Sequence, residues 1–356
     1  MVRIVILSAF ASPFRSGAEA CSEEVARALN GRFDITMVTS RLRRDLPGRD
    51  VLPGGVPLLR IGIGTSIDPW LFPLLAPFAA RRLQPDIIHA VLESYAGLAL
   101  AFCRFIVPKA KRLLTLQSTN TSFLLGPIHR SPHAITAISS VLSERAKRFG
   151  RSDVALIPNG VPLKGIEDAC RAIQKQMPPH ILFVGRLEPM KGIDTLLHAF
   201  ALLPERMQDG TRLTIVGDGT LRSMLGVLAG ELNISSRVTF TGYLTAEDLY
   251  KEFAGAAVFC GLSRSEALGN VFLEAQAAGC AVIATKVGGI PDIIKDGETG
   301  ILVAPDDPKA AAVALEKVLT DKHLRDRLGE AGKAHAKDFD WAAIAERYAD
   351  VYHHLL

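Results

Sequence analysis

Short apolar runs alternate with amphipathic segments along almost the whole chain. In the first half, runs rich in β-branched residues predict strands at 2–8, 34–39, 57–61, 86–90, 111–116, 134–138 and 154–157. Between them, helical periodicity predicts helices at 17–30, 69–83, 93–106 and 140–149. Strands that alternate with helices are typical of an α/β fold, in which a parallel sheet is covered on both faces.

The second half repeats this order of elements. Apolar runs predict strands near 180–184, 212–216, 237–240, 257–260, 281–284 and 300–303. Helices are expected at 191–203, 220–232, 245–254, 269–278, 307–320 and 321–336. Two such series predict two doubly wound, Rossmann-like domains.

The boundary between the two series lies near residues 163–178, where a polar helical segment leads to Pro178-Pro179. We therefore expect an N-terminal domain at 1–164 and a C-terminal domain at 165–337. A last helix at 340–355 follows the second series without a strand after it. Ligands of open α/β sheets bind beyond the carboxyl ends of the strands, so chemistry is expected in the loops there.

The composition suits two large cores, and the charge is divided unevenly. Of 356 residues, 48% are hydrophobic and 22% charged, which favours two domains over one. Residues 1–164 carry 21 Lys and Arg against 11 Asp and Glu, a net charge of +10, and the remainder carries −6. A basic half beside an acidic half suggests an anionic partner or surface for the first domain. The alternative is a solvated basic face without function.

The cysteines form no motif for a zinc site, and Asp338-Phe339-Asp340, which resembles a metal-binding D-x-D, is more simply explained by Asp340 as a helix N-cap. The five cysteines are widely spaced, and no C-x-x-C or Cys/His ligand pattern occurs, which favours free thiols in a reducing compartment. The amino-terminal run M-V-R-I-V-I-L-S-A-F is too short for a secretory signal, and no apolar run is long enough to span a bilayer. We expect a protein that lies in the cytoplasm, either free or peripheral on the inner face of the membrane. We expect it to need no metal or cofactor.

One apolar stripe has two interpretations. Its residues are Trp70, Leu71, Phe72, Leu74, Leu75 and Phe78, and Arg81-Arg82 follow it. Such a stripe is most often core packing. Because the same half also carries a set of basic residues, contact with a membrane or a lipid phosphate stays open. That set is Arg41, Arg43, Arg44, Lys109, Lys111 and Arg112.

Two glutamates carry the strongest functional signal. Glu266 falls in the polar loop before the helix predicted at 269–278, and Glu274 lies about one turn into that helix. The N–H groups of a helix start can hold a phosphate, and carboxylates accept hydrogen bonds from the vicinal hydroxyls of a ribose or a hexose. The neighbours of Glu274 are apolar, so an unpaired carboxylate there would be costly and a ligand is a plausible partner. Two surface acids are the alternative.

Two cations follow the strand predicted at 180–184. Arg186 and Lys191 lie in V-G-R-L-E-P-M-K-G, in the loop and the first turn after that strand. Positive charges oppose the dipole of a helix start, so their place there favours binding of an anion. Since the sequence has no obvious metal site, Arg186 and Lys191 are the best candidates to neutralise a diphosphate.

Five motifs together resemble one known family. They are E-x7-E at 266–274, V-G-R-L-E-P-M-K-G at 184–192, V-G-D-G at 216–219, P-N-G-V at 158–161, and G-G-I-P-D with D-G-E-T-G at 288–300. In order and separation they resemble the retaining nucleotide-sugar glycosyltransferases of family 4, over nearly the whole chain. The resemblance implies the GT-B architecture, in which an acceptor-binding and a donor-binding domain face a cleft. It also implies that the last helix, within 338–356, returns to the first domain.

The resemblance implies a role for each candidate residue. Arg186 and Lys191 would bind the diphosphate, Glu266 and the backbone of residues 267–270 would hold the sugar, and Glu274 would bind the ribose. We expect Arg186, Lys191 and Glu266 to be catalytic, and the loop at Gly242 to contact the base. The full donor-binding set is Gly17, Arg186, Lys191, Gly242, Tyr243, Leu244, Glu266, Ala267, Leu268, Gly269, Asn270, Val271 and Glu274.

The acceptor side departs from the family's pattern. Family members commonly carry a histidine after the strand that corresponds to 111–116, and this chain has Gln117 there. Glutamine forms hydrogen bonds to hydroxyls but does not transfer a proton at neutral pH. Either the reaction needs no proton-transferring histidine at this position, or His89, His129 or His133 fills that role. The family's two glycines after the first strand are here Ser16-Gly17, and the acceptor-side candidates are Ser16, Gln117 and His89.

The resemblance implies a retaining, metal-independent hexosyltransferase. It would move a mannose or glucose type of sugar from a GDP- or UDP-sugar to a hydroxyl of a glycan, a glycolipid or a small molecule. The acceptor could be lipid-linked or anionic, and nucleic acid is not an expected partner. The alternatives are an epimerase or hydrolase of nucleotide sugars with similar architecture, and a non-catalytic protein that binds a nucleotide sugar.

Overall fold

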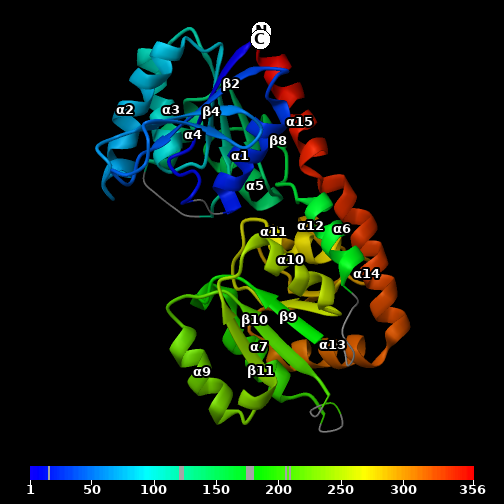
Figure 1. Ribbon diagram of the computed structural model, residues 1–356. Helices are drawn as coiled ribbons and strands as arrows, with labels where there is room; N and C mark the ends of the chain where they lie inside the picture. Colours follow the sequence, from blue (N-terminus) through cyan, green and yellow to red (C-terminus); the bar gives the residue numbers. More distant parts are fainter. Residues whose placement is uncertain (15–16, 120–123, 174–179, 205–206, 208–209) are drawn as a thin grey trace. The chain divides into compact units, whose positions relative to one another are not determined.

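The chain folds into two compact α/β units (Figure 1). The computed structural model describes all residues except 15–16, 120–123, 174–179, 205–206 and 208–209. Unit 1 consists of Met1–Gly160 and Trp341–Leu356, and unit 2 consists of Val161–Asp340. The terminal helix is thus grouped with Met1–Gly160 in this division, whereas the sequence-based expectation was 1–164 with the last helix and 165–337.

Unit 1 is built on a largely parallel sheet with the strand order β3-β4-β2-β1-β5-β6-β7-β8. The pairs are parallel except for β3 with β4, which is antiparallel. The strands are β1 (Arg3–Leu7), β2 (Asp34–Ser40), β3 (Arg49–Leu52), β4 (Val56–Ile61), β5 (Ile87–Val91), β6 (Lys111–Leu116), β7 (Ala134–Ala137) and β8 (Val154–Leu156).

Helices cover this sheet, and one of them comes from the carboxyl end of the chain. The helices are α1 (Gly17–Leu29), α2 (Asp68–Leu83), α3 (Tyr95–Ile106), α4 (Leu125–Arg130), α5 (Ser140–Arg148) and α15 (Trp341–Leu355). Helix α15 packs against α1, and its residues Ile344, Tyr348 and Tyr352 are buried in the core with β1 and β2. Helices α2 and α3 lie side by side (Figure 1).

Unit 2 has a parallel sheet with the order β11-β10-β9-β12-β13-β14. Its strands are β9 (His180–Val184), β10 (Arg212–Val216), β11 (Val238–Gly242), β12 (Val258–Gly261), β13 (Ala281–Thr285) and β14 (Ile301–Val303). Its helices are α6 (Leu163–Ala172), α7 (Ile193–Ala201), α9 (Arg222–Glu231), α10 (Ala246–Gly255), α11 (Asn270–Ala277), α12 (Ile290–Ile293), α13 (Pro308–Thr320) and α14 (Lys322–Ala336). Three 3-10 turns accompany them among the described residues: η1 (Pro189–Lys191), η2 (Ser235–Arg237) and η3 (Lys337–Phe339).

The sequence missed a few short elements. Each expected strand is present, but β3 was not predicted, because R-D-V-L is short, mostly exposed and half charged. Helices α4 and α12 were also missed, since four to six residues are too few for a helical period to show. None of these omissions changes the fold class.

Candidate functional site

Most candidate residues of unit 2 lie in loops at the carboxyl edge of its sheet, and Asn270, Val271 and Glu274 lie on α11 directly after one of these loops. Strands β9 and β12 are neighbours, so the loop after β9, at 185–191, and the loop after β12, at 262–269, leave the sheet side by side. Residues 75 positions apart in sequence meet here, Lys191 from the first loop and Glu266 from the second.

Lys191 and Glu266 form an ion pair. The Nζ atom of Lys191 donates to Oε1 of Glu266, and the two side chains are only 18% and 12% exposed. Ser263 Oγ donates to the same oxygen at 3.1 Å. Among the described residues, both hydrogen bonds to the Glu266 carboxylate go to Oε1, which leaves Oε2 to accept a hydrogen bond from a ligand. The pair therefore offers a cation and an acceptor at one point.

Two glycines bring the surrounding backbone close to this pair. Gly192 has a φ of +62°, and a Cβ there would lie 1.9 Å from the carbonyl oxygen of Leu262. Gly288 has a φ of +54°, and a Cβ there would lie 1.8 Å from the carbonyl oxygen of Glu266. Any side chain would push these loops apart, so glycine is required at both positions.

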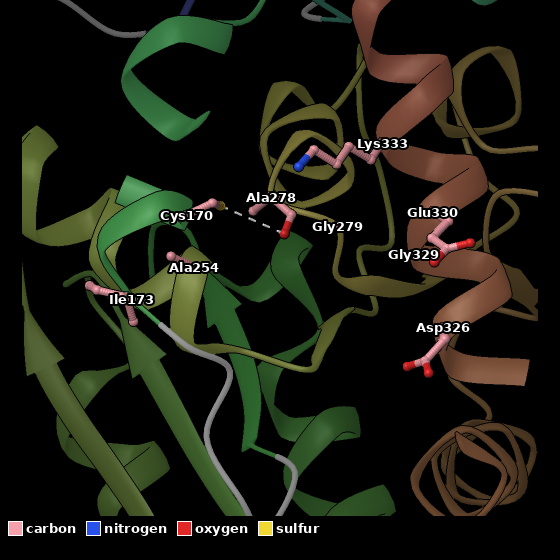
Figure 2. A pocket seen from close by; sticks show the side chains of 9 residues that line it. All are labelled: Cys170, Ile173, Ala254, Ala278, Gly279, Asp326, Gly329, Glu330 and Lys333. Atoms are coloured by element: carbon pink, nitrogen blue, oxygen red, sulfur yellow. Dashed lines mark hydrogen bonds between the residues drawn. The ribbon is translucent and has the colours of Figure 1, made fainter. Parts of the chain in front are cut away.

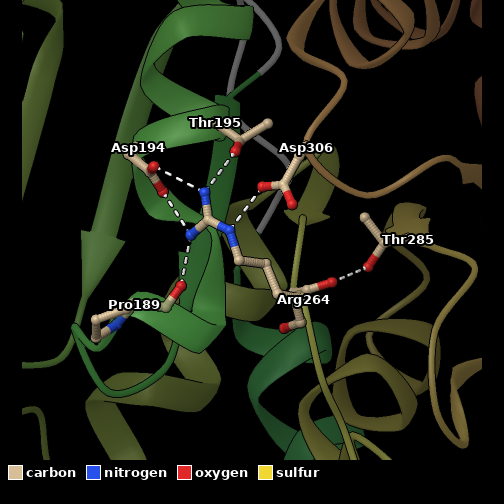
Figure 3. A network of polar contacts seen from close by, with 7 residues as sticks. Pro189, Asp194, Thr195, Arg264, Thr285 and Asp306 are labelled. Atoms are coloured by element: carbon tan, nitrogen blue, oxygen red, sulfur yellow. Dashed lines mark hydrogen bonds and ion pairs between the residues drawn. The ribbon is translucent and has the colours of Figure 1, made fainter.

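Arg264 ties the two loops together (Figure 3). Its guanidinium forms two parallel hydrogen bonds to Asp194, at 3.0 and 2.8 Å, and Nε donates to Asp306 at 2.6 Å. It also donates to the carbonyl oxygen of Pro189, and the Arg264 backbone N–H donates to the carbonyl of Met190 at 2.8 Å. The bonds to Pro189 and Met190 hold the turn η1, and with it Lys191, against the loop that carries Glu266.

The electrostatics of this network favour its charged form. Burial opposes ionisation of Asp194, but its hydrogen bonds and charge interaction with Arg264 outweigh burial and hold the pKa of that carboxyl below its usual range. The bonds to Asp194 and Asp306 raise the pKa of Arg264 above its usual range. Bidentate arginine pairs of this kind add geometric order as well as energy.

Glu274 lies on α11, whose first turn follows Gly269 and has no side-chain cap. Its side chain is half-buried, and it has no hydrogen-bond or ion-pair partner among the described residues. Burial raises the pKa of Glu274 to about 7. A ligand that donates hydrogen bonds to this carboxyl would stabilise its ionised form, which burial disfavours.

The remaining donor-side candidates are spread along the same edge. Arg186 is exposed, and its guanidinium has no partner among the described residues. Tyr243 is also exposed, at 73%, directly after Gly242 at the end of β11. Leu268 is buried, so only its backbone can reach a ligand. The other candidates are partly exposed: Leu244, Ala267, Gly269, Asn270 and Val271.

In unit 1, Gln117 is held in an amide pair. Its Nε2 donates to Asn159 Oδ1, and Asn159 Nδ2 donates to Gln117 Oε1, both at 2.9 Å. The backbone N–H groups of Gln117 and Ser118 donate to the buried carboxylate of Glu93, at 3.0 and 3.3 Å. Glu93 also pairs with Arg145. Burial raises the pKa of Glu93 despite the charge of Arg145. Glu93 was not among the candidates predicted from the sequence, although it follows a predicted strand.

The structure contradicts the expectation that His89 lies on the acceptor side. His89 is fully buried beneath α15, where Nδ1 is 2.7 Å from the Tyr352 hydroxyl and Nε2 is 2.7 Å from Thr115 Oγ1. Burial lowers its pKa to about 3. Both ring nitrogens are occupied by protein partners, so His89 joins the terminal helix to the sheet.

The other two histidines are also poorly placed for proton transfer. His129 is fully buried against Phe149, and burial, with Arg145 and Arg151 nearby, lowers its pKa to about 4. His133 is exposed but directly precedes β7, at the opposite edge from the carboxyl ends of the strands. Gly17 is exposed at the first turn of α1, and Ser16 lies outside the described residues.

A separate cavity of about 310 Å³ lies near the carboxyl end of α11, and Glu266 is not among the residues that line it (Figure 2). Its lining comes from α6, α14 and the end of α10. It includes Cys170, whose Sγ is 3.8 Å from the carbonyl oxygen of Ala278. Ile173, which also lines it, directly precedes residues 174–179, which the structure does not describe. This cavity is not part of the candidate site.

Comparison with known proteins decides the family. A family model described as Glycosyl transferases group 1 matches residues 167–335, and one described as Glycosyltransferase Family 4 matches residues 15–164. The lipopolysaccharide core biosynthesis glycosyltransferase LpsE of Rhizobium meliloti is 31% identical over 294 residues, which are 80% of this chain and 80% of that protein. The chain belongs to glycosyltransferase family 4.

Other similar proteins carry varied names. A D-inositol 3-phosphate glycosyltransferase of Corynebacterium diphtheriae is 40% identical over 48% of this chain, and the match spans only 41% of that relative. Sucrose-phosphate synthase from Thermosynechococcus elongatus is similar in structure, with a TM-score of 0.87 and 25% identity over 100% of this chain and 99% of that one. HepE of Anabaena in complex with UDP-glucose has a TM-score of 0.79 and 20% identity, and the match covers 99% of this chain and 100% of that one. The chain therefore has the GT-B architecture.

Proposed function

We propose that this glycosyltransferase moves a hexose from a nucleotide diphosphate sugar to a hydroxyl, with retention of configuration and without a metal. The observation that carries the proposal is the Lys191–Glu266 ion pair, beside a helix start and in the same loop as Arg186. It joins a cation for the diphosphate to a carboxylate for the sugar.

The leaving diphosphate would be held by Arg186 and Lys191. Bond cleavage puts negative charge on the phosphate oxygen, and preorganised cations stabilise that charge in the transition state. Lys191 keeps two of its N–H donors while it pairs with Glu266. The exposed guanidinium of Arg186 can supply a planar, bidentate contact.

The sugar and the ribose would be held by the two carboxylates. Glu266 would accept hydrogen bonds from hexose hydroxyls at Oε2, and the partly exposed loop at 267–270 would add backbone contacts. Glu274 would accept the ribose hydroxyls, which favour its ionised form. Tyr243 would lie against the base.

Retention would follow from attack on the face that the phosphate leaves. The acceptor oxygen forms its bond to the anomeric carbon while the bond from that carbon to the phosphate oxygen breaks. The proton of the acceptor hydroxyl passes to the departing phosphate oxygen. This route depends on positioning and on stabilisation of the leaving group. It needs no protein base, which suits the burial of His89 and His129 and the amide pair of Gln117.

The donor we propose is a UDP- or GDP-hexose of the glucose or mannose type. The complex of HepE with UDP-glucose supports a nucleotide-sugar donor in this architecture. For the acceptor we propose a hydroxyl of a glycan, a glycolipid or a small molecule. The net charge of +10 in residues 1–164 suits an anionic or lipid-linked acceptor, and a cytoplasmic or membrane-peripheral location.

A transfer assay tests the proposal. Purified protein is incubated with one nucleotide sugar and a panel of acceptors, and both nucleoside diphosphate and glycosylated product are measured. We expect product of retained anomeric configuration, and a loss of at least 100-fold in Glu266→Gln and Lys191→Met. Arg171→Met, an exposed arginine on α6, should leave the rate unchanged.

Three results would contradict the proposal. Inverted product would exclude the mechanism, and equal rates in the wild type and both variants would exclude the site. If the donor were consumed at a rate that no acceptor changes, the protein would instead be a hydrolase or an epimerase.

A further inference from the structure

One face of α2 exposes large apolar side chains. Ile67, Trp70, Leu74 and Phe78 are between 52% and 72% exposed. Their spacing of three, four and four residues places them on one side of the helix. We call these four residues with Ile63, itself 55% exposed, the α2 apolar face.

This face is not the core side of the helix. Phe72, Ala76 and Ala80 of α2 are buried, and the helix packs against α3 and β2 through its inner side. The apolar stripe seen in the sequence therefore contains both a core side and an outer side. A row of exposed aromatic and aliphatic side chains on one helix is typical of an interaction surface.

Asp68 fixes the loops beside this face. Its buried carboxylate accepts backbone hydrogen bonds from Leu42 at 3.1 Å, Ile63 at 3.0 Å and Gly64 at 2.9 Å. A Cβ on Gly64 would lie 2.8 Å from the Cα of Arg44, so that arginine packs directly against the loop of Ile63. One buried residue thus holds an arginine-rich loop against the start of the apolar face.

Basic residues lie near this face, and its helix exposes no acid. Asp68 is the acid of α2, and it is buried. Exposed arginines are present in the loop before the face, at the end of α2 and on α3 beside the exposed Phe105. They are Arg44, Arg81, Arg82 and Arg104; Arg43 is exposed as well, but it pairs with the exposed Asp45.

We propose that the α2 apolar face docks on a membrane surface that contains anionic lipids. Tryptophan and phenylalanine insert between headgroups and acyl chains, and arginines bind lipid phosphates. No described helix is long and apolar enough to cross a membrane, so this contact is with one leaflet. The inference does not rest on the proposed transfer reaction, because it concerns a surface of unit 1 that needs no donor.

The chain provides its own reporter for this contact. It has two tryptophans, the exposed Trp70 and the buried Trp341. In a Trp341→Phe variant, Trp70 alone reports, and insertion into a bilayer shifts its emission to shorter wavelength. The experiment titrates this variant, without donor, with vesicles of phosphatidylcholine alone and of phosphatidylcholine with phosphatidylglycerol. Far-ultraviolet circular dichroism checks that each variant is folded.

We expect the blue shift and co-sedimentation only with anionic vesicles. Leu74→Glu should weaken binding at least tenfold, whereas Val227→Glu, at an equally exposed helical position on α9 of unit 2, should not. Arg81→Gln and Arg82→Gln should each weaken binding roughly fivefold, and added salt should weaken it further.

The proposal is overturned by any of three results. They are no shift of Trp70 with anionic vesicles, equal binding to neutral and anionic vesicles, and a shift that follows protein concentration without vesicles. The last would identify the face as a contact between copies of the chain.

Discussion

At the scale of single residues, the candidate site contains one ion pair and an arginine that bonds to the loops on either side of it. Lys191 and Glu266 neutralise each other and are held by loops that two glycines bring into contact. Arg264 fixes these loops through partners 70 and 42 residues away in sequence. A diphosphate sugar would therefore meet a preformed cation and acceptor, which limits the reorganisation needed on binding.

Replacing Arg264 tests whether it positions the pair. We expect Arg264→Met to raise the dissociation constant for the donor and to lower kcat/KM by roughly 10- to 100-fold, because small displacements of catalytic groups are costly. Arg264→Lys, which keeps one ion pair, should recover part of the loss. Donor titration and steady-state kinetics measure both effects, and Arg171→Met is the control. If Arg264→Met lowered the stability of the folded chain but left its affinity for the donor unchanged, the role of Arg264 would be purely structural.

The half-buried Glu274 makes stability depend on pH. Its pKa is about 7 in the folded chain and about 4.3 in an unfolded one. Between these values the folded chain binds the extra proton, so stability falls as pH rises from about 4.5 to 7 and then levels off. We expect this loss, roughly 3 kcal/mol, to be absent in Glu274→Gln. Urea denaturation at several pH values measures it, and parallel curves for the two proteins would refute it.

The same residue should make donor binding depend on pH. Ribose hydroxyls donate to an ionised carboxylate, so affinity for a nucleotide sugar should rise several-fold from pH 6 to pH 8. The diphosphate of a nucleotide sugar is esterified at both ends and does not titrate in this range. Calorimetric titration of wild type and Glu274→Gln measures the dependence, which should be flat in the variant. A flat profile in the wild type would remove Glu274 from the ribose contact.

At the scale of elements, α15 is held to unit 1 by a buried polar chain as well as by packing. His89 bonds Tyr352, and through Thr115 the chain continues to Thr136, 2.7 Å away. The Tyr352 ring also packs edge-on against Phe33, with centroids 5.6 Å apart. The hydroxyl can therefore be removed while the ring contact stays.

Tyr352→Phe should destabilise unit 1 by about 1–3 kcal/mol, because it leaves a buried nitrogen of His89 without a partner. Denaturant unfolding followed by circular dichroism measures this change. Tyr243→Phe, at an exposed position, should change stability by less than about 0.5 kcal/mol. Equal stabilities of the two variants would show that the His89 chain contributes little.

The helices and strands also show which features could be predicted from the sequence and which could not. Periodicity predicted the helices and strands to within a few residues, because each long element repeats its apolar positions. It could not show which side of α2 faces outward, since Trp70 and Phe72 are both apolar and only packing separates them. Arg264 was missed for a similar reason, because its partners are distant in sequence and meet only in the fold.

At the scale of the whole molecule, the motifs predicted the family and the architecture, and the comparisons confirm both. The assignment of His89 to the acceptor side is wrong, because the sequence cannot show whether a histidine within a strand is covered by a helix or faces a ligand, and in β5 it lies beneath α15. The basic half of the chain falls mainly in unit 1, which carries the α2 apolar face. The acidic half falls mainly in unit 2, which carries most of the donor candidates.

The most direct test of the central claim is donor binding by calorimetry. UDP-glucose, GDP-mannose and ADP-glucose are titrated into the full chain, into Lys191→Met and Arg186→Met, and into Arg171→Met as the control. We expect at least one nucleotide sugar to bind the wild type and the control equally, and each of the first two variants at least tenfold more weakly. Binding of none of the three, or equal binding by all four proteins, would contradict the assignment of the donor site.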